Sequence, residues 1–235
     1  MFQEAAAALS SFPHVFEVSE TAVTLRDKPE WLDLDEESKL QARTLAVGRV
    51  LRTLRDEGNV PMLYGWRDEA FAVRPSFYAP PALVIERAAG PLFGLPSFGC
   101  FTNGYICMDG SDRPTHLWLG RRSRTKPTWP GLLDCIAAGG IAAGQSVSSA
   151  MVRECAEEAG ISDHLSSRLR SSGGVSYTGF NEDGWGIKSD VLFTFDLRLP
   201  EDFTPVPVDG EMEEFMLLSI DEVCEASCCN RPASK

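Results

Sequence analysis

Basic side chains, histidine and long apolar runs are scarce in this chain of 235 residues. The 22 Lys and Arg residues are outnumbered by 34 Asp and Glu, so the formal net charge is −12 at pH 7. A field of that sign repels phosphate backbones and anionic lipid surfaces over a Debye length. We therefore expect neither nucleic acid nor a membrane among the partners of this protein.

We also expect neither a transmembrane nor a secretory segment. No apolar run is long enough to span a bilayer, and the start MFQEAAAALSSF has a glutamate and no basic region before its alanines. The seven cysteines are an odd number, and the cluster Cys224, Cys228 and Cys229 has no histidine at zinc-site spacing. These features predict free thiols and a cytoplasmic location, with an organelle as the alternative if a targeting extension is missing from this chain.

The first part of the chain has the pattern of a small α+β domain. Short helix and strand patterns at 4–9, 14–18 and 22–25 precede a strong amphipathic helix over 36–57. A segment rich in Pro and aromatics follows up to Pro96, with a short strand at 82–86. We expect this domain and its connector to cover residues 1–96.

The remainder, 97–235, predicts an α/β domain. Strand patterns at 98–108, 115–121 and 133–137 precede a helix over 146–159, and a closing helix is expected at 220–227. Three further strands are expected between those helices, at 174–180, 187–197 and 211–218. A mixed sheet with one central helix, an α/β/α sandwich, is the fold class that these elements favour.

The segment Gly139–Ile161 carries the clearest chemistry. Glu154, Glu157 and Glu158 stand at i, i+3 and i+4, within one narrow arc of a helix. Three like charges so close repel one another unless a cation lies among them, and oxygen ligands suit a hard divalent ion. A solvated acidic face is the alternative interpretation. The glycines before the helix favour a tight loop close to a metal or phosphate: Gly139, Gly140 and Gly144.

This segment resembles the Nudix box: glycine, five residues, glutamate, seven residues, Arg-Glu, two residues, Glu-Glu, one residue, glycine. The matching positions are Gly139, Arg153, Glu154, Cys155, Glu157, Glu158, Gly160 and Ile161. Gln145 stands where the family has its first glutamate. The resemblance implies a Nudix hydrolase domain that uses Mg²⁺ or Mn²⁺ to hydrolyse a small-molecule diphosphate.

Four further segments look like one Nudix subfamily, which has an N-terminal domain of unknown function and occurs fused to thiamine pyrophosphokinase in some fungi. They are MLYGWRDEAFAV, LVIERAAGPLFGLPSFGCFTNGYI, LWLGRRSRTKPTWPGLLD and DGEMEEF. The resemblance implies hydrolysis of thiamin diphosphate or its oxidised analogues to the monophosphate. Two alternatives stay open: an ADP-ribose or other nucleoside-diphosphate-X diphosphatase, and a catalytically silent Nudix-fold binding module.

The resemblance also implies roles for single residues. Glu154, Glu157 and Glu158 would hold the metal ions, with one of them as base for the attacking water, and Arg153 would orient them. The backbone carbonyl of Ala138 would be an additional ligand. A further carboxylate is expected from the later acidic segment, with Glu211 as the candidate ligand and the nearby Glu213 and Glu214 as alternatives.

Two groups of residues are candidates for substrate contacts. The basic run Arg121, Arg122, Arg124 and Lys126 predicts a diphosphate clamp, with a solvated basic loop as the alternative. Aromatic residues that would stack on a substrate ring, or else belong to the core, are Trp118, Trp129, Tyr177, Phe180 and Trp185. Nothing in the sequence indicates the oligomeric state.

Overall fold

The computed structural model describes residues 3–108, 110–126, 128–180 and 185–229. The chain divides into two compact units. The first comprises Met1–Ser97 with Ala142–Gly144 and Ser176–Val191, and the second comprises Phe98–Ile141, Gln145–Val175 and Leu192–Lys235. Each unit is therefore built from several separate segments of the chain.

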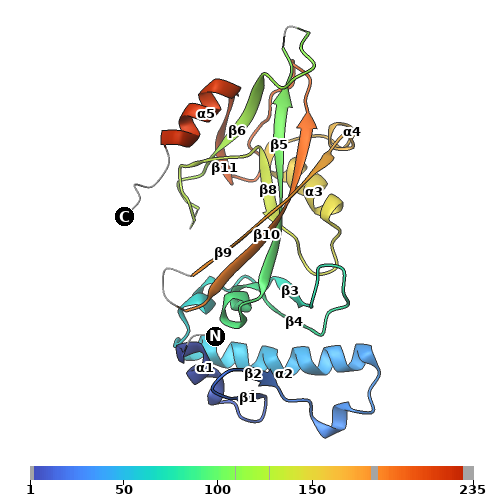
Figure 1. Ribbon diagram of the computed structural model, residues 1–235, viewed down its shortest axis with the longest axis vertical. Coiled ribbons are helices and arrows are strands. Elements are labelled where there is room, and N and C mark those ends of the chain that lie inside the picture. The colour runs from blue at the N-terminus through green and yellow to red at the C-terminus, as the bar shows by residue number, and fades with distance from the viewer. Residues whose placement is uncertain (1–2, 109, 127, 181–184, 230–235) are drawn as a thin grey trace. The chain divides into compact units, whose positions relative to one another are not determined.

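The first unit combines two helices with two hairpins (Figure 1). The hairpins pair β1 (Phe16–Val18) with β2 (Val23–Leu25) and β3 (Ala70–Val73) with β4 (Leu83–Glu86), both antiparallel. Its helices are α1 (Gln3–Ser10) and α2 (Glu36–Glu57), and short 3-10 segments lie at Pro29–Trp31, Pro61–Gly65 and Arg87–Phe93. Strand β3 was not expected from the sequence, because four residues become a strand only through the pairing with β4.

Helix α2 forms where its sequence pattern predicts it. The side chain of Asp35 accepts a hydrogen bond from the backbone N–H of Ser38 (2.8 Å), and Gly58 ends the helix in the left-handed conformation with φ of 69°. One face is buried and supplies the core of this unit: Val47, Val50, Leu51 and Leu54.

The largest sheet has seven strands in the order β11–β6–β5–β10–β9, with β7 paired to β6 and β8 paired to β5; most of it belongs to the second unit, and the end of β9 and the start of β10 belong to the first. The strands are β5 (Pro96–Ile106), β6 (His116–Arg122), β7 (Leu133–Asp134), β8 (Ala137–Gly140), β9 (Arg170–Phe180), β10 (Ile187–Arg198) and β11 (Met212–Ser219). Asn103 bonds to Asp196, and Tyr105 bonds to Leu199. The partner's number rises as the number in β5 rises, so β5 and β10 run parallel. Because β5 is antiparallel to β6 and β8, the sheet is mixed, as predicted.

Helix α3 (Val147–Ala159) packs on β8, and α5 (Ile220–Cys229) packs beside β11 and β6 (Figure 1). The hydroxyl of Ser146 accepts from the Ser149 N–H at the start of α3, and Gly160 ends it with φ of 63°. A short helix, α4 (Asp163–Ser166), follows. Among the buried residues of α3 are four apolar ones that anchor it to the sheet: Ala150, Met151, Cys155 and Ala159.

Two details of the sheet differ from expectation. The strand predicted over 133–137 is two strands, because β7 pairs with β6 while β8 pairs with β5. Strand β9 starts at Arg170 rather than at residue 174. Polar and glycine residues hide this start in the sequence, and pairing within the sheet extends the strand through them.

The sequence predicts no membrane-spanning segment and free thiols, and the described residues bear on both predictions. Over the described residues, no helix is both long and apolar enough to cross a membrane. The cysteines whose side chains are described are free: Cys100, Cys107, Cys135, Cys155 and Cys224. The side chains of Cys228 and Cys229 lie outside the described part of the structure.

Candidate active site

Helix α3 presents its three glutamates to different surroundings. At about 100° per residue, Glu158 is turned about 40° from Glu154 in one direction and Glu157 about 60° in the other. Glu154 and Glu158 are buried, with 8% and 2% of their surface exposed, whereas half of the Glu157 side chain is exposed. The arc seen in the sequence is therefore divided between a buried and a solvated edge.

Glu158 is held by the strand beneath the helix. Its Oε2 accepts a hydrogen bond from the backbone N–H of Ala138 in β8 (2.9 Å). Burial raises the pKa of the Glu158 carboxyl to about 8; the Ala138 N–H opposes the shift, and the charges of Glu211, Glu154 and Asp209 add to it. A carboxylate in such a position is stabilised by any cation that neutralises the group.

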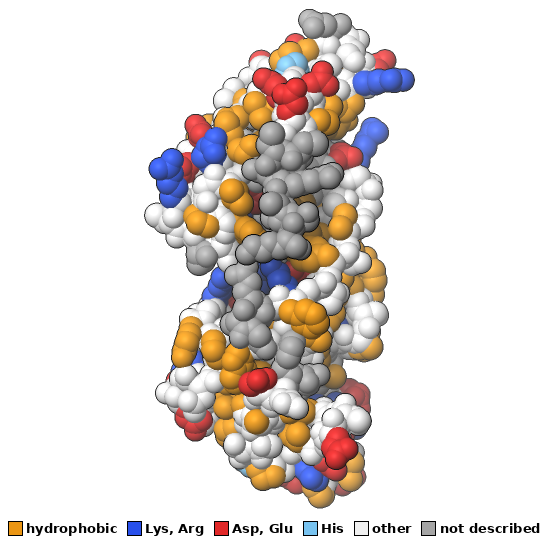
Figure 2. Space-filling view, turned by 60° about the vertical axis from the view of Figure 1, so that its left-hand side comes forward, with side chains coloured by type: hydrophobic (Ala, Val, Ile, Leu, Met, Phe, Trp, Pro, Cys, Tyr) orange, Lys and Arg blue, Asp and Glu red, His pale blue; other side chains and the backbone are white. Residues whose placement is uncertain are grey.

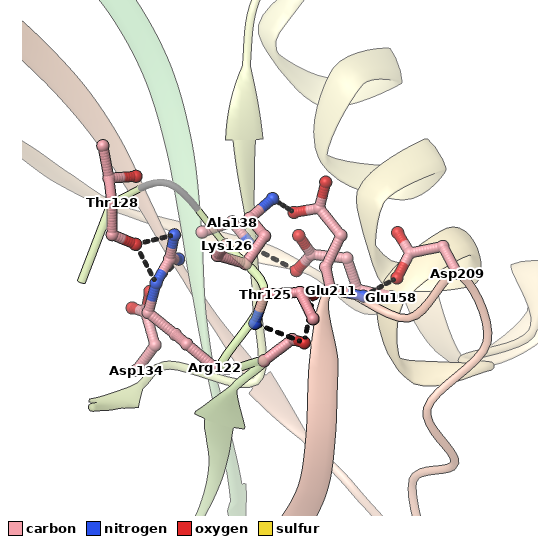
Figure 3. Close-up of polar contacts among 10 residues, drawn as sticks. Arg122, Thr125, Lys126, Thr128, Asp134, Ala138, Glu158, Asp209 and Glu211 are labelled. Atoms are coloured by element: carbon pink, nitrogen blue, oxygen red, sulfur yellow. Dashed lines mark hydrogen bonds and ion pairs between the residues drawn. The ribbon is translucent and has the colours of Figure 1, made fainter. Parts of the chain in front are cut away.

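The segment before β11 brings two more carboxylates to Glu158. Ligand oxygens of Glu158, Asp209 and Glu211 all lie within 4.8 Å of one another. Figure 3 shows the three side chains converging. The Asp209 Oδ1 atom also accepts the backbone N–H of Glu211 (2.8 Å), which fixes the turn from which both side chains project. An all-oxygen donor set of this kind fits a hard divalent cation such as Mg²⁺ or Mn²⁺.

Arg153 binds the other two glutamates of the helix. Its guanidinium donates hydrogen bonds to Glu154 and, at 2.6 Å, to Glu157. Burial raises the pKa of the Glu154 carboxyl and the ion pair with Arg153 opposes this, while the charges of Glu157 and Glu211 add to the rise. Arg153 thus fixes the orientation of Glu154 next to the Glu158–Asp209–Glu211 group.

Gly139 is required by the position of Glu154. A Cβ atom at this residue would lie 2.6 Å from the Cγ of Glu154 and closer still to its carboxylate. The side chain of Glu154 is nearly buried, so it has little space to move aside. The first glycine of the Nudix-like segment therefore provides the room into which its central glutamate folds.

The basic run at the end of β6 and in the turn after it is paired with acidic partners. Arg121 pairs with Glu214 across the β6–β11 register (2.8 Å), and Arg122 pairs with Asp134 (2.9 Å) and binds the carbonyl of Thr128. Arg124 is highly exposed; its guanidinium lies 3.8 Å from Glu213, whose carboxylate accepts the Arg124 backbone N–H. Figure 2 shows dispersed Lys and Arg side chains, with no continuous basic patch among the described residues on the face that it draws.

Lys126 is the member of the run that reaches the carboxylate group. Its Nζ lies 2.6 Å from Oε2 of Glu211, and only about a quarter of the side chain is exposed. Burial alone would raise the pKa of Glu211, but the bond to Lys126 and its charge lower the pKa overall. Figure 3 shows Lys126 beside Glu211, with Ala138 beside Glu158.

The aromatic candidates differ in exposure. Trp118 in β6 is buried, whereas Trp129, Tyr177 and Phe180 are exposed. Burial, a hydrogen bond to Asp190 and the charge of Asp190 raise the pKa of the Tyr177 hydroxyl to about 12. Trp185 is partly buried.

Asp209 was missed in the sequence. It stands two residues before Glu211, in the same acidic segment, and could have been considered on that ground. The sequence nevertheless gives no reason to prefer it over Glu213 or Glu214, which the structure pairs with Arg124 and Arg121. The preference comes from the turn at Gly210, where φ is 81°.

Comparison with known proteins assigns the two parts of the chain to families. Residues 104–232 match the NUDIX domain, and residues 1–97 match the domain of unknown function DUF4743. The chain therefore belongs to the Nudix family, and the predicted fold class, an α/β Nudix domain preceded by a small α+β domain, is confirmed.

The chain is also similar to individual proteins and to solved structures. Nudix hydrolase 20, chloroplastic, from Arabidopsis thaliana is 45% identical over 185 residues, covering 79% of this chain and 47% of that protein. The uncharacterized protein YJR142W from Saccharomyces cerevisiae is 32% identical over 92% of this chain and 63% of its own length. Among solved structures, DR0079 from Deinococcus radiodurans covers 59% of this chain and 76% of its own, at 21% identity and a TM-score of 0.45. The chain spans about half the length of the Arabidopsis relatives it matches.

Proposed function

We propose that this protein hydrolyses a diphosphate linkage in a small molecule with the help of Mg²⁺ or Mn²⁺. The observation that carries the proposal is the convergence of Glu158, Asp209 and Glu211 beside Glu154, on the helix of the Nudix box. Four carboxylates gathered around buried positions have no evident structural use without a cation. Family membership supports the same chemistry.

In this proposal the residues of the site have distinct tasks. Glu154, Glu157, Glu158 and Glu211 would hold the metal, together with Asp209 and the backbone carbonyl of Ala138. When bound, a divalent ion neutralises diphosphate oxygens and lowers the pKa of a water molecule. Arg153 keeps Glu154 and Glu157 oriented, and one of the helix glutamates accepts the proton of the attacking water. No protein nucleophile is needed for such a hydrolysis.

The basic run has a more limited task than its sequence indicates. Lys126 is the member that we assign to the phosphate-binding side of the site, because its ammonium group lies on Glu211. Arg121 and Arg122 bind Glu214 and Asp134, so a contact of either with phosphate requires competition with a carboxylate. Arg124 is highly exposed and only loosely paired with Glu213, so we assign it a second phosphate contact.

For the substrate we propose thiamin diphosphate or its oxidised analogues, which are cleaved to the monophosphate and phosphate. The support is the resemblance of segments on both sides of residue 97 to the subfamily described above. The alternative substrate is ADP-ribose or a related nucleoside-diphosphate compound, since the box fixes the bond cleaved and leaves the attached group open.

One experiment separates these possibilities. Product release from thiamin diphosphate, its oxidised analogues and ADP-ribose is measured in parallel with Mg²⁺, with Mn²⁺ and with excess chelator. We expect metal-dependent cleavage with a higher kcat/KM for the thiamin compounds. A higher kcat/KM for ADP-ribose would assign the alternative substrate. Mn²⁺ binding without cleavage of any compound would indicate a silent binding module.

We also propose a cytoplasmic location, with a plastid as the alternative. Two Arabidopsis relatives carry the word chloroplastic in their names. A fluorescent fusion of the natural gene product, imaged in its own cells, distinguishes the two compartments.

A further inference from the structure

We infer that Lys126 exchanges partners: it binds Glu211 in competition with the divalent ion, and it binds the diphosphate once the ion holds Glu211. The inference rests on the proposed function. It adds a coupling between metal and substrate that depends on one lysine of this chain, the residue that bridges the basic run and the carboxylate group.

The backbone holds Lys126 at this position. The Ser123 N–H donates to the carbonyl of Glu211 (2.8 Å), and the Lys126 N–H donates to the carbonyl of Ser123 (3.1 Å). Both the main chain and the side chain of Glu211 are therefore tied to the same turn. A side chain so anchored remains near the site after it leaves Glu211, which keeps the entropic cost of a second contact low.

Arg121 and Arg122 are engaged with other partners, and Arg124 is exposed. Arg122 is 16% exposed and held by Asp134 and the carbonyl of Thr128, and Arg121 bonds Glu214 and the carbonyl of Gly131. The arginines bind with fixed, planar forks, whereas a lysine is a flexible point charge with three donors. Of the four, Lys126 has both a partner within the carboxylate group and the side chain suited to change partners.

Charge explains why the two partners exclude each other. The carboxylates of Glu154, Glu158, Asp209 and Glu211 face Arg153 and Lys126 as direct partners, and the charge of Arg122 also acts on Glu211. The Nζ of Lys126 lies 2.6 Å from Oε2 of Glu211. A divalent ion binds carboxylate oxygens at about 2.0–2.6 Å, so it would need the same side of this oxygen. When the ion takes that oxygen, ammonium and ion repel each other, and an anionic diphosphate is the natural new partner of the ammonium.

The test is a pair of binding measurements on Lys126→Met in the full chain. The dissociation constant for Mn²⁺ is measured by electron paramagnetic resonance, and that for methylenediphosphonate, a non-hydrolysable diphosphate, at saturating Mn²⁺. We expect the variant to bind Mn²⁺ at least about fivefold more tightly and methylenediphosphonate at least about fivefold more weakly, roughly 1 kcal/mol in each case. Lys126→Arg should preserve more of the diphosphate affinity than methionine does.

A matched control is available in the first unit. Lys39 forms a 2.9 Å ion pair with Glu36, and its side chain is 22% exposed against 24% for Lys126. Lys39→Met therefore removes an equivalent pair and should change neither constant. Thermal melts of both variants check that the fold is intact.

The opposite signs distinguish this inference from simpler ones. Weaker binding of both ligands by Lys126→Met would mean that the lysine merely maintains the site, and unchanged binding would mean an idle ion pair; either result overturns the exchange. Failure of the unmodified protein to bind Mn²⁺ would overturn the proposed function itself, and the exchange with it. The two failures are thus told apart by the unmodified protein alone.

Discussion

Helices α2 and α3 follow the same rules of sequence and treat their glutamates in opposite ways. Each has a polar N-cap residue, a left-handed glycine at its end and a buried apolar face. In α2 the glutamates Glu36, Glu37 and Glu57 are exposed, whereas in α3 Glu154 and Glu158 are buried. Buried like charges lower stability, so their presence in α3 indicates selection for a task other than folding.

Chelation should have the largest effect on this contrast. Removing divalent ions should abolish diphosphate hydrolysis, and adding Mg²⁺ or Mn²⁺ should restore it, because the clustered carboxylates repel a diphosphate unless a divalent ion lies among them. The melting temperature should rise with metal by mass action. Hydrolysis that persists in excess chelator would show that the α3 glutamates do not act by binding a metal, and their burial would then have no explanation.

Glu158→Gln and Glu57→Gln compare one glutamate from each helix. Loss of a metal-binding carboxylate should lower turnover by at least about a hundredfold, roughly 2.7 kcal/mol, whereas the exposed Glu57 should have no effect. The same Glu158 variant should melt at a higher temperature without metal, since a neutral amide is easier to bury than a carboxylate. Kinetic assays and thermal melts measure both effects. Normal turnover in Glu158→Gln would show that Glu158 is not part of the site.

Glycine-to-alanine changes in the two units should affect different properties: catalysis at Gly139 and stability at Gly48. At Gly139 the new Cβ would overlap Glu154 and displace it, so we expect about tenfold lower kcat/KM, roughly 1.4 kcal/mol. At Gly48, inside α2, the new Cβ would meet only the flexible end of Arg52 at 3.4 Å. Alanine there should stabilise the protein by about 0.5–1 kcal/mol without changing kcat/KM. Equal kcat/KM for Gly139→Ala and the native protein would show that Glu154 tolerates displacement.

The N-caps should give the smallest effect and differ in their response to pH. Hydrogen bonds from Ser38 lower the pKa of Asp35 in the folded protein. The cap of α2 therefore stabilises the protein fully above the pKa of Asp35 in the unfolded chain, about 4. This stabilisation is lost as the pH falls through the lower pKa of the folded state. The Ser146 cap of α3 does not titrate, and Ser146→Ala should cost about 1 kcal/mol at any pH. Urea unfolding at pH 7 and at pH 3 measures both. Asp35→Asn should reduce the acid sensitivity, and an unchanged pH dependence would argue against the cap.

Much of the fold could be predicted because its signals are local. Residues 36–57 and 147–159 carry caps and apolar periodicity within themselves, and the structure places helices there. Strand β3, and the separation of β7 from β8, depend on partners distant in the chain. Periodicity within a segment carries no record of such partners.

The same division holds for the site. The Nudix box depends on fixed spacing, so the sequence alone points to Glu154 and Glu158 and to a divalent metal. Asp209 joins them only because a turn before β11 returns to the end of α3, where the Val206 N–H bonds the carbonyl of Ala159 (3.2 Å). Spacing along a helix fixes the side of the helix on which its side chains lie. It does not determine which residues of other elements pack against that side.

The sequence by itself determined the family, the helix that bears the glutamates and the sign of the charge around them. Only the tertiary structure decided which carboxylates share one centre and which cation stands among them. Arg121, Arg122, Arg124 and Lys126 look equivalent along the chain, yet the register of β6 with β11 and the turn after β6 give them different acidic partners. Covalent neighbours set the local conformation, whereas an ion pair forms where the folded chain leaves two opposite charges within reach.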